Sequence, residues 1–112
     1  ALMPDNHPIT MALAKLYMEQ KKAEKARILL TRHIRSHNTP RVYQALWLAQ
    51  GRSGMNAHAK ISQAEFYVLY GDYRSAKQHL QQLQVLSHHS PELRSLTMTL
   101  AQQLHQSINF SN

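Results

Sequence analysis

A short segment of this sequence occurs twice, with its two copies 50 residues apart. Residues 13–30 and 63–80 each contain a small residue, an aromatic residue three positions later, a break, and then alanine followed by leucine four positions later. The identical pairs are Ala14 and Ala64, Tyr17 and Tyr67, Ala26 and Ala76, and Leu30 and Leu80. This pattern is typical of a helix–turn–helix hairpin that buries one face against neighbouring helices. It predicts a stacked helical scaffold that binds another protein, rather than a catalytic domain.

Helical spacing and helix-capping residues extend this prediction to the whole chain. Thr39 and Ser90 precede prolines and are expected to cap helices, as are Asn56 and Asp72 after glycine-containing breaks. The predicted helices cover about 8–20, 23–37, 40–52, 56–70, 73–87 and 91–106. We therefore expect an all-α fold, a right-handed stack of about six antiparallel helices that form about three hairpins. Residues 1–106 would form a single domain, and residues 107–112 a disordered tail.

The hydrophobic surfaces of two segments differ in width. Residues 56–70 are apolar around most of the helix, which predicts that this helix is sandwiched between others. Residues 91–106 carry one narrow stripe, which predicts a terminal helix that caps the stack. The stripe consists of Leu93, Leu96, Leu100 and Leu104. Most of the aromatic residues between positions 43 and 73 are expected in the core, with one or two lining a groove.

The charge of the chain limits its partners. Its net charge is +7, and residues 1–56 hold nine Lys/Arg against three acidic residues, whereas residues 57–112 hold four against three. A basic surface of this kind attracts acidic proteins, nucleic acid or anionic lipid.

The absence of cysteine excludes disulfides and thiolate zinc sites. No apolar run is long enough for a membrane span, and the chain as given begins without a signal peptide.

No metal or catalytic site is predicted from the sequence. His33 and His37 lie one helical turn apart, but no carboxylate accompanies them and Arg32 and Arg35 flank them. We expect His33 to be partly buried and His37 to be solvated, and neither to bind zinc. The six acidic residues form no catalytic pair, and Glu65 is interpreted as a groove-edge residue or the partner of Lys60.

The doubled pattern resembles the tetratricopeptide repeat, in which two helices meet through small residues around a Gly-Asp/Asn turn. The second copy matches most signature positions, namely Ala64, Tyr67, Gly71, Asp72, Tyr73, Ala76 and Leu80. In the first copy Lys21 replaces the turn glycine, and Trp47 and Gln63 depart from the pattern in the middle helices. The resemblance implies a tetratricopeptide-like α-solenoid fragment.

A narrower resemblance covers residues 43–86. It rests on residues 43–46, Gly51 to Gly54, Ala57-His58, residues 63–67 and Gly71. These residues are similar to the C-terminal repeat domain of periplasmic zinc metallopeptidases of the β-barrel assembly-enhancing protease family. That family joins a repeat domain to an HExxH peptidase domain. The HExxH motif is absent here, so no zinc ligand or catalytic residue carries over, and any zinc would belong to the parent protease.

The resemblance implies a non-catalytic periplasmic module for protein–protein interaction. It would dock clients or outer-membrane assembly factors for a protease whose catalytic domain lies outside this chain. By the geometry of the repeat family, the candidate partner-binding residues are Met11, Lys15, Met18, Gln44, Leu48, His58, Ile61, Glu65 and Leu69. The alternatives are a self-standing repeat adaptor that binds an acidic peptide or protein and, less favoured, a basic helical nucleic-acid binder.

Overall fold

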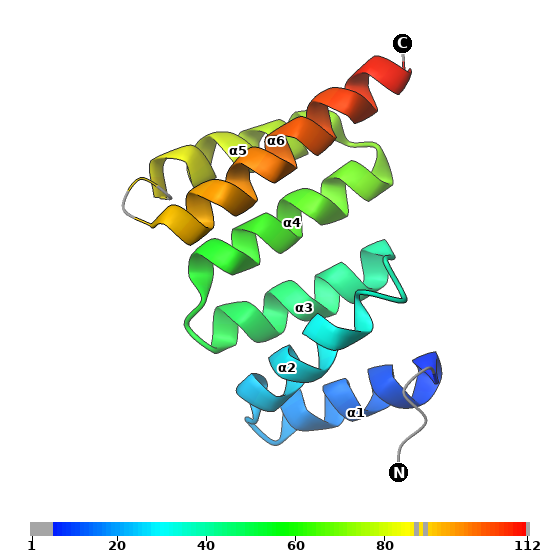
Figure 1. The fold of residues 1–112 in the computed structure, drawn as a ribbon. Coiled ribbons are helices and arrows are strands. Elements are labelled where there is room, and N and C mark those ends of the chain that lie inside the picture. The colour runs from blue at the N-terminus through cyan, green and yellow to red at the C-terminus, as the bar shows by residue number, and fades with distance from the viewer. Residues whose placement is uncertain (1–5, 87, 89, 112) are drawn as a thin grey trace.

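The computed structural model describes residues 6–86, 88 and 90–111 as a stack of six helices (Figure 1). They are α1 (His7–Glu19), α2 (Ala23–His33), α3 (Pro40–Arg52), α4 (Asn56–Tyr70), α5 (Tyr73–Leu86) and α6 (Pro91–Ser111). Consecutive helices run in roughly opposite directions, and these residues contain no strand. The structure therefore confirms the all-α stack of six helices that the helical spacing predicts.

The helices form two units of three, and each unit has its own hydrophobic core. The first core combines buried residues of α1, α2 and α3, and the second combines buried residues of α4, α5 and α6. The first consists of Ala14, Ala26, Leu30, Val42, Leu46 and Ala49, and the second of Ala64, Ala76, Leu80, Leu83, Leu100 and Leu104. The third helix of each unit closes its core. The two hydrophobic cores therefore divide the stack of six antiparallel helices into two three-helix units.

The third helix of each unit begins with the same capping interaction. The backbone N–H of Val42 donates to Thr39 Oγ1 over 3.4 Å, and that of Leu93 donates to Ser90 Oγ over 3.3 Å. Proline follows each cap at the first helical position, where its missing N–H and fixed φ cost little. The predicted caps Thr39 and Ser90 are confirmed. They lie 51 positions apart (90 − 39), so the repeat extends through all three helices with one inserted residue.

The turns after α1, α3 and α4 share one conformation. In each turn a backbone N–H donates to the carbonyl five positions earlier, from Lys22 to Tyr17, Met55 to Gln50 and Asp72 to Tyr67. The residue before each donor has a positive φ, which glycine adopts without strain. Two of these residues are Gly54 (φ 81°) and Gly71 (φ 82°), but the third is Lys21 (φ 59°). The first turn thus keeps its geometry although lysine replaces glycine.

Three local predictions are wrong. α2 ends at His33 instead of continuing to position 37, because Arg35 and Ser36 donate to carbonyls three residues back in a tighter turn. α6 continues to Ser111, so positions 107–111 are helical and only residue 112 of the predicted tail lies outside the described residues. Asn56 is the first residue of α4, and its side chain makes no capping bond; the cap position belongs to Met55.

The two units meet where α3 packs on α4, which is the most extensive contact between any two helices. Ser62 and Gln50 are both buried there, and Trp47 packs edge-on against Phe66 with ring centroids 4.9 Å apart. α4 also contacts α5 and α6, as its broad apolar surface predicts. On α6, Leu100 and Leu104 are buried as predicted, but Leu96 is exposed and its neighbour Thr97 is buried instead. The Thr97 hydroxyl donates to the carbonyl of Leu93 over 2.7 Å, so this buried hydroxyl has a hydrogen-bond partner.

Candidate functional site

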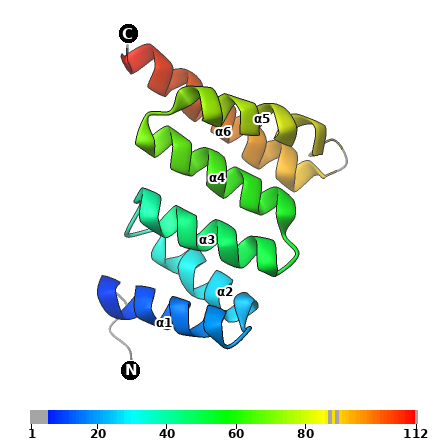
Figure 2. The ribbon, with the colours of Figure 1, turned by 180° about the vertical axis from the view of Figure 1, so that it is seen from behind.

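A groove of about 650 Å³ lies between α1 and α3 in the first unit. Its walls come from these two helices, and Leu30 of α2 contributes to its base. The lining residues are His7, Pro8, Met11, Ala12, Ala14, Lys15, Met18, Leu30, Arg41, Gln44, Ala45, Leu48 and Arg52. In the view of Figure 2, α2 lies behind α1 and α3, so the groove opens toward the viewer.

The groove forms in the first unit because its outer helices barely meet. α1 and α3 make few contacts with each other, whereas the equivalent helices α4 and α6 pack together more closely. In the second unit, Ile61 of α4 packs against the core that α4 shares with α5 and α6. His58 Nε2, also on α4, lies 3.9 Å from a carboxylate oxygen of Glu92 on α6. α3 is held instead by its extensive contact with α4. Because α1 and α3 make few contacts, the space between them remains open as the groove.

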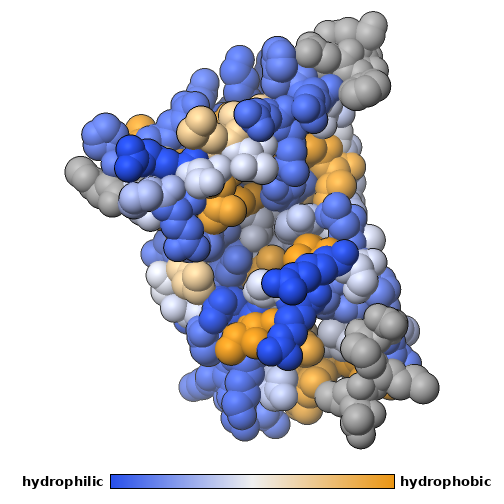
Figure 3. All heavy atoms as spheres, viewed as in Figure 1, coloured by the Kyte–Doolittle hydropathy of each residue, from blue (hydrophilic) through white to orange (hydrophobic). Residues whose placement is uncertain are grey.

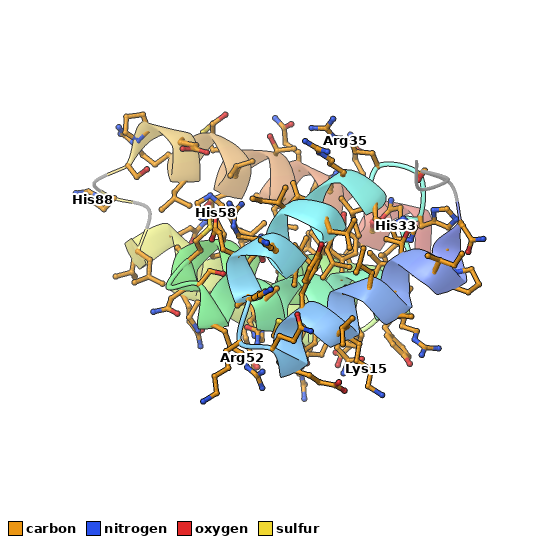
Figure 4. All side chains as sticks on the ribbon, turned by 90° about the horizontal axis from the view of Figure 1, so that it is seen from below. Lys15, His33, Arg35, Arg52, His58 and His88 are labelled. Carbon is orange, nitrogen blue, oxygen red and sulfur yellow. The ribbon has the colours of Figure 1, made fainter. Side chains whose placement is uncertain are left out.

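The groove combines an apolar lining with positive charge at its rim. Lys15, Arg41 and Arg52 are all exposed, and the described lining residues include no carboxylate. Lys15 and Arg52 project from the same side of the molecule in Figure 4, opposite to Arg35. Leu48 is 48% exposed, although it belongs to the lining. Such a surface suits a segment that carries both apolar and acidic side chains.

The face opposite the groove has a different distribution of hydrophobic side chains. In Figure 3, which has the orientation of Figure 1, hydrophobic side chains form separate patches divided by strongly hydrophilic ones. α2 lies toward the viewer on this face. The groove itself joins apolar surface with space for a ligand.

The structure brings together five of the nine predicted partner-binding residues. Met11, Lys15, Met18, Gln44 and Leu48 all line the groove between α1 and α3. The other four, His58, Ile61, Glu65 and Leu69, lie on α4 and are not among the groove residues. Among the described residues that line the groove there is no Trp, Tyr or Phe, so the lining includes none of the expected aromatic anchors.

Glu65 has a different environment from the one expected. Burial raises the pKa of its carboxyl group. Tyr43, on α3, has its pKa raised to about 12 by burial and then by the charge of Glu65, which places the two side chains near each other. Lys60, the expected partner of Glu65, instead donates a 2.7 Å hydrogen bond to Gln82. Glu65 is thus a half-buried carboxyl group at the junction of the two units.

A second cluster contains three histidines, one of which sequence reasoning missed. The ring nitrogens of His7, His33 and His37 that could bind a metal all lie within 4.8 Å of one another. His33 is buried at 4% exposure, and His37 is half-buried instead of solvated. His7 lies 26 positions before His33, and the only sequence signal for it was its place at the start of a predicted helix. His7 also lines the groove, so the cluster lies at one end of it.

No known protein family, curated protein or solved structure matches this chain. Among the described residues, no helix combines the length and hydrophobicity that a membrane span requires.

Proposed function

We propose that this chain is a non-catalytic protein-binding module whose groove between α1 and α3 holds an acidic segment with apolar side chains. The observation that carries the proposal is the composition of the groove. Apolar side chains from Met11, Met18 and Leu48 lie in it, Lys15, Arg41 and Arg52 supply positive charge, and no described lining residue carries a carboxylate.

The resemblance to periplasmic zinc metallopeptidases suggests what the occupant would be. In that setting the groove would dock a client or an outer-membrane assembly factor for a peptidase domain outside this chain. A self-standing tetratricopeptide-like adaptor would use the same groove for an acidic peptide or protein. The reading frame upstream distinguishes the two, because only the first requires a signal peptide and an HExxH motif.

A peptide-display library tests the proposed specificity. We expect selected peptides to be rich in Asp and Glu interspersed with large apolar residues. Fluorescence anisotropy with one labelled selected peptide then measures affinity. Charge reversal at Lys15, Arg41 or Arg52 is expected to weaken binding by roughly fivefold to tenfold each, because each removes an attraction and adds a repulsion. Leu48→Asp should abolish binding, because it places a carboxylate among the apolar contacts.

Matched variants outside the groove serve as controls. Lys77→Glu reverses one exposed charge on α5, and Val85→Asp adds one carboxylate at a position that is 76% exposed. Neither should change the affinity by more than about twofold. Equal losses for Lys77→Glu and Lys15→Glu would contradict the proposal, because they would indicate attraction to net charge alone. Binding of single-stranded nucleic acid with a steep salt dependence, unaffected by Leu48→Asp, would favour the nucleic-acid alternative instead.

A further inference from the structure

Three histidines from separate parts of the first unit meet at one end of the groove. His7 is the first residue of α1, His33 is the last residue of α2, and His37 lies in the link to α3. His7 Nδ1 and His33 Nε2 are 2.7 Å apart. The three rings stack nearly parallel, with centroids 4.3 to 5.0 Å apart and interplanar angles of 16 to 18°.

The second unit shows that the fold does not require this cluster. His33 corresponds to Leu83, 50 positions later, which is fully buried in the second core. His7 corresponds to Ala57. His33 is also buried, yet its Nδ1 has no hydrogen-bond partner among the described residues. A leucine would pack here without a buried polar atom, so a role other than packing accounts better for the histidine.

We propose that His7, His33 and His37 bind a divalent transition-metal ion, which links the beginning of α1 to the end of α2. Three imidazoles match the number of protein ligands in an open zinc site, where water or a ligand takes the fourth position. A ligand set of neutral imidazoles without a carboxylate suits zinc, nickel or copper and does not suit magnesium or calcium.

The surroundings of His33 and His37 are compatible with metal binding. Burial, and then the neighbouring His37 and His7, hold the pKa of His33 below its ordinary value, which favours the neutral imidazole that a metal ion requires. Ser36 Oγ lies 3.0 Å from His37 Nδ1, a contact of the kind that orients a ligating ring and leaves its other nitrogen for the metal. Arg32 and Arg35, the nearby cations, are both exposed to solvent, which screens their charge.

Metal binding requires the three rings to move, because their ligand atoms are now separated by up to 4.8 Å. Two nitrogens bound tetrahedrally to zinc at about 2.0–2.1 Å lie about 3.3 Å apart, slightly farther than His7 and His33 are now. The rings must also tilt out of their stack so that their nitrogens converge on one point. His7 and His37 are half-buried at the surface, so both rings can rotate while the buried His33 stays in place.

Zinc titration by isothermal calorimetry tests the site in a chain that carries His88→Ala and His89→Ala, which removes an adjacent histidine pair that could bind metal adventitiously. We expect one Zn²⁺ per chain. His7→Ala, His33→Leu and His37→Ala should each weaken binding by at least about tenfold, because each removes one of three ligands. With Co²⁺ as the probe, the visible absorption of a low-symmetry cobalt site should appear and should disappear in the same variants.

His58→Ala is the matched control, because His58 is a half-buried histidine that lies well away from His33 (Figure 4). It should leave Zn²⁺ affinity unchanged. Thermal unfolding gives an independent measurement. Zn²⁺ should raise the Tm of the parent chain, which carries only His88→Ala and His89→Ala, but not the Tm of the same chain with His33→Leu added. His33→Leu places at position 33 the residue type that Leu83 provides in the second unit, so the variant is expected to fold. Failure of the parent chain to bind Zn²⁺, or unchanged binding in folded His33→Leu, would overturn the proposal.

Discussion

The Ser62 hydroxyl donates a 2.6 Å hydrogen bond to Gln50 Oε1, and both side chains are buried where the two three-helix units meet. Neither residue belongs to either hydrophobic core. The bond therefore joins α3 to α4 across the junction on which the openness of the groove depends.

Ser62→Ala is expected to destabilise the chain by about 1–3 kcal/mol, because it leaves the buried amide of Gln50 without its partner. Urea unfolding followed by circular dichroism measures this change. Replacing both partners, in Ser62→Ala/Gln50→Leu, should recover much of the loss, because no orphaned polar group remains. Ser95→Ala, at an exposed position of α6, should stay within about 0.5 kcal/mol of the parent chain. A double variant no more stable than Ser62→Ala would contradict this account.

Lys21→Gly should stabilise the chain by about 1 kcal/mol, because lysine adopts a left-handed conformation there that glycine adopts without strain. Gly71→Ala, at the equivalent turn, should have the opposite effect of similar size. A Cβ at Gly71 would meet no atom within 4 Å, so its cost arises from the backbone alone. Lys22→Gly provides the control, since φ at Lys22 is −106° and glycine gains nothing there. Denaturant midpoints measure all three variants, and equal effects at positions 21 and 22 would refute the interpretation.

Without metal, His33→Leu should stabilise the chain by about 1–3 kcal/mol, because it removes a buried nitrogen that lacks a hydrogen-bond partner among the described residues. Chelator-treated protein and chemical denaturation give the measurement. The reverse exchange in the second unit, Leu83→His, should destabilise the chain, because it places an imidazole in an aliphatic core. A loss of stability in metal-free His33→Leu would show that the histidine cluster is itself stabilising.

Glu65→Gln should stabilise the chain at neutral pH and have little effect below about pH 4.5, the ordinary pKa of the carboxyl group. Burial raises the pKa of Glu65 in the folded state. The unfolded chain therefore releases its proton first as pH rises through 4.5, and the folded state loses stability until the pH exceeds its own higher pKa. Unfolding free energies across this pH range test the sign. Exposed Glu19→Gln is the control, and a parallel profile for both variants would contradict the burial argument.

The sequence by itself determined the helices and most of their boundaries, because these depend on neighbours in the chain. The spacing of apolar residues, the caps at Thr39 and Ser90 and the turn at Gly71 act within a few positions. The early end of α2 was not predicted, because it results from hydrogen bonds between backbone groups in a tight turn, and no residue type in the sequence indicates that turn. Five of the nine residues that the repeat-family geometry suggested as partner-binding line the groove, because all five lie on α1 and α3.

Only the tertiary structure decided which surfaces come together. The groove exists because α3 packs on α4 while α1 stays apart from α3, and this distance depends on contacts across both units. The same packing separated the four candidates on α4 from the groove. His7 joined His33 across 26 positions because two helix ends meet in space, a proximity that helical periodicity does not encode. The 50-residue repeat thus predicted the scaffold, and the departures between its copies, such as His33 in place of leucine, mark where the two units differ.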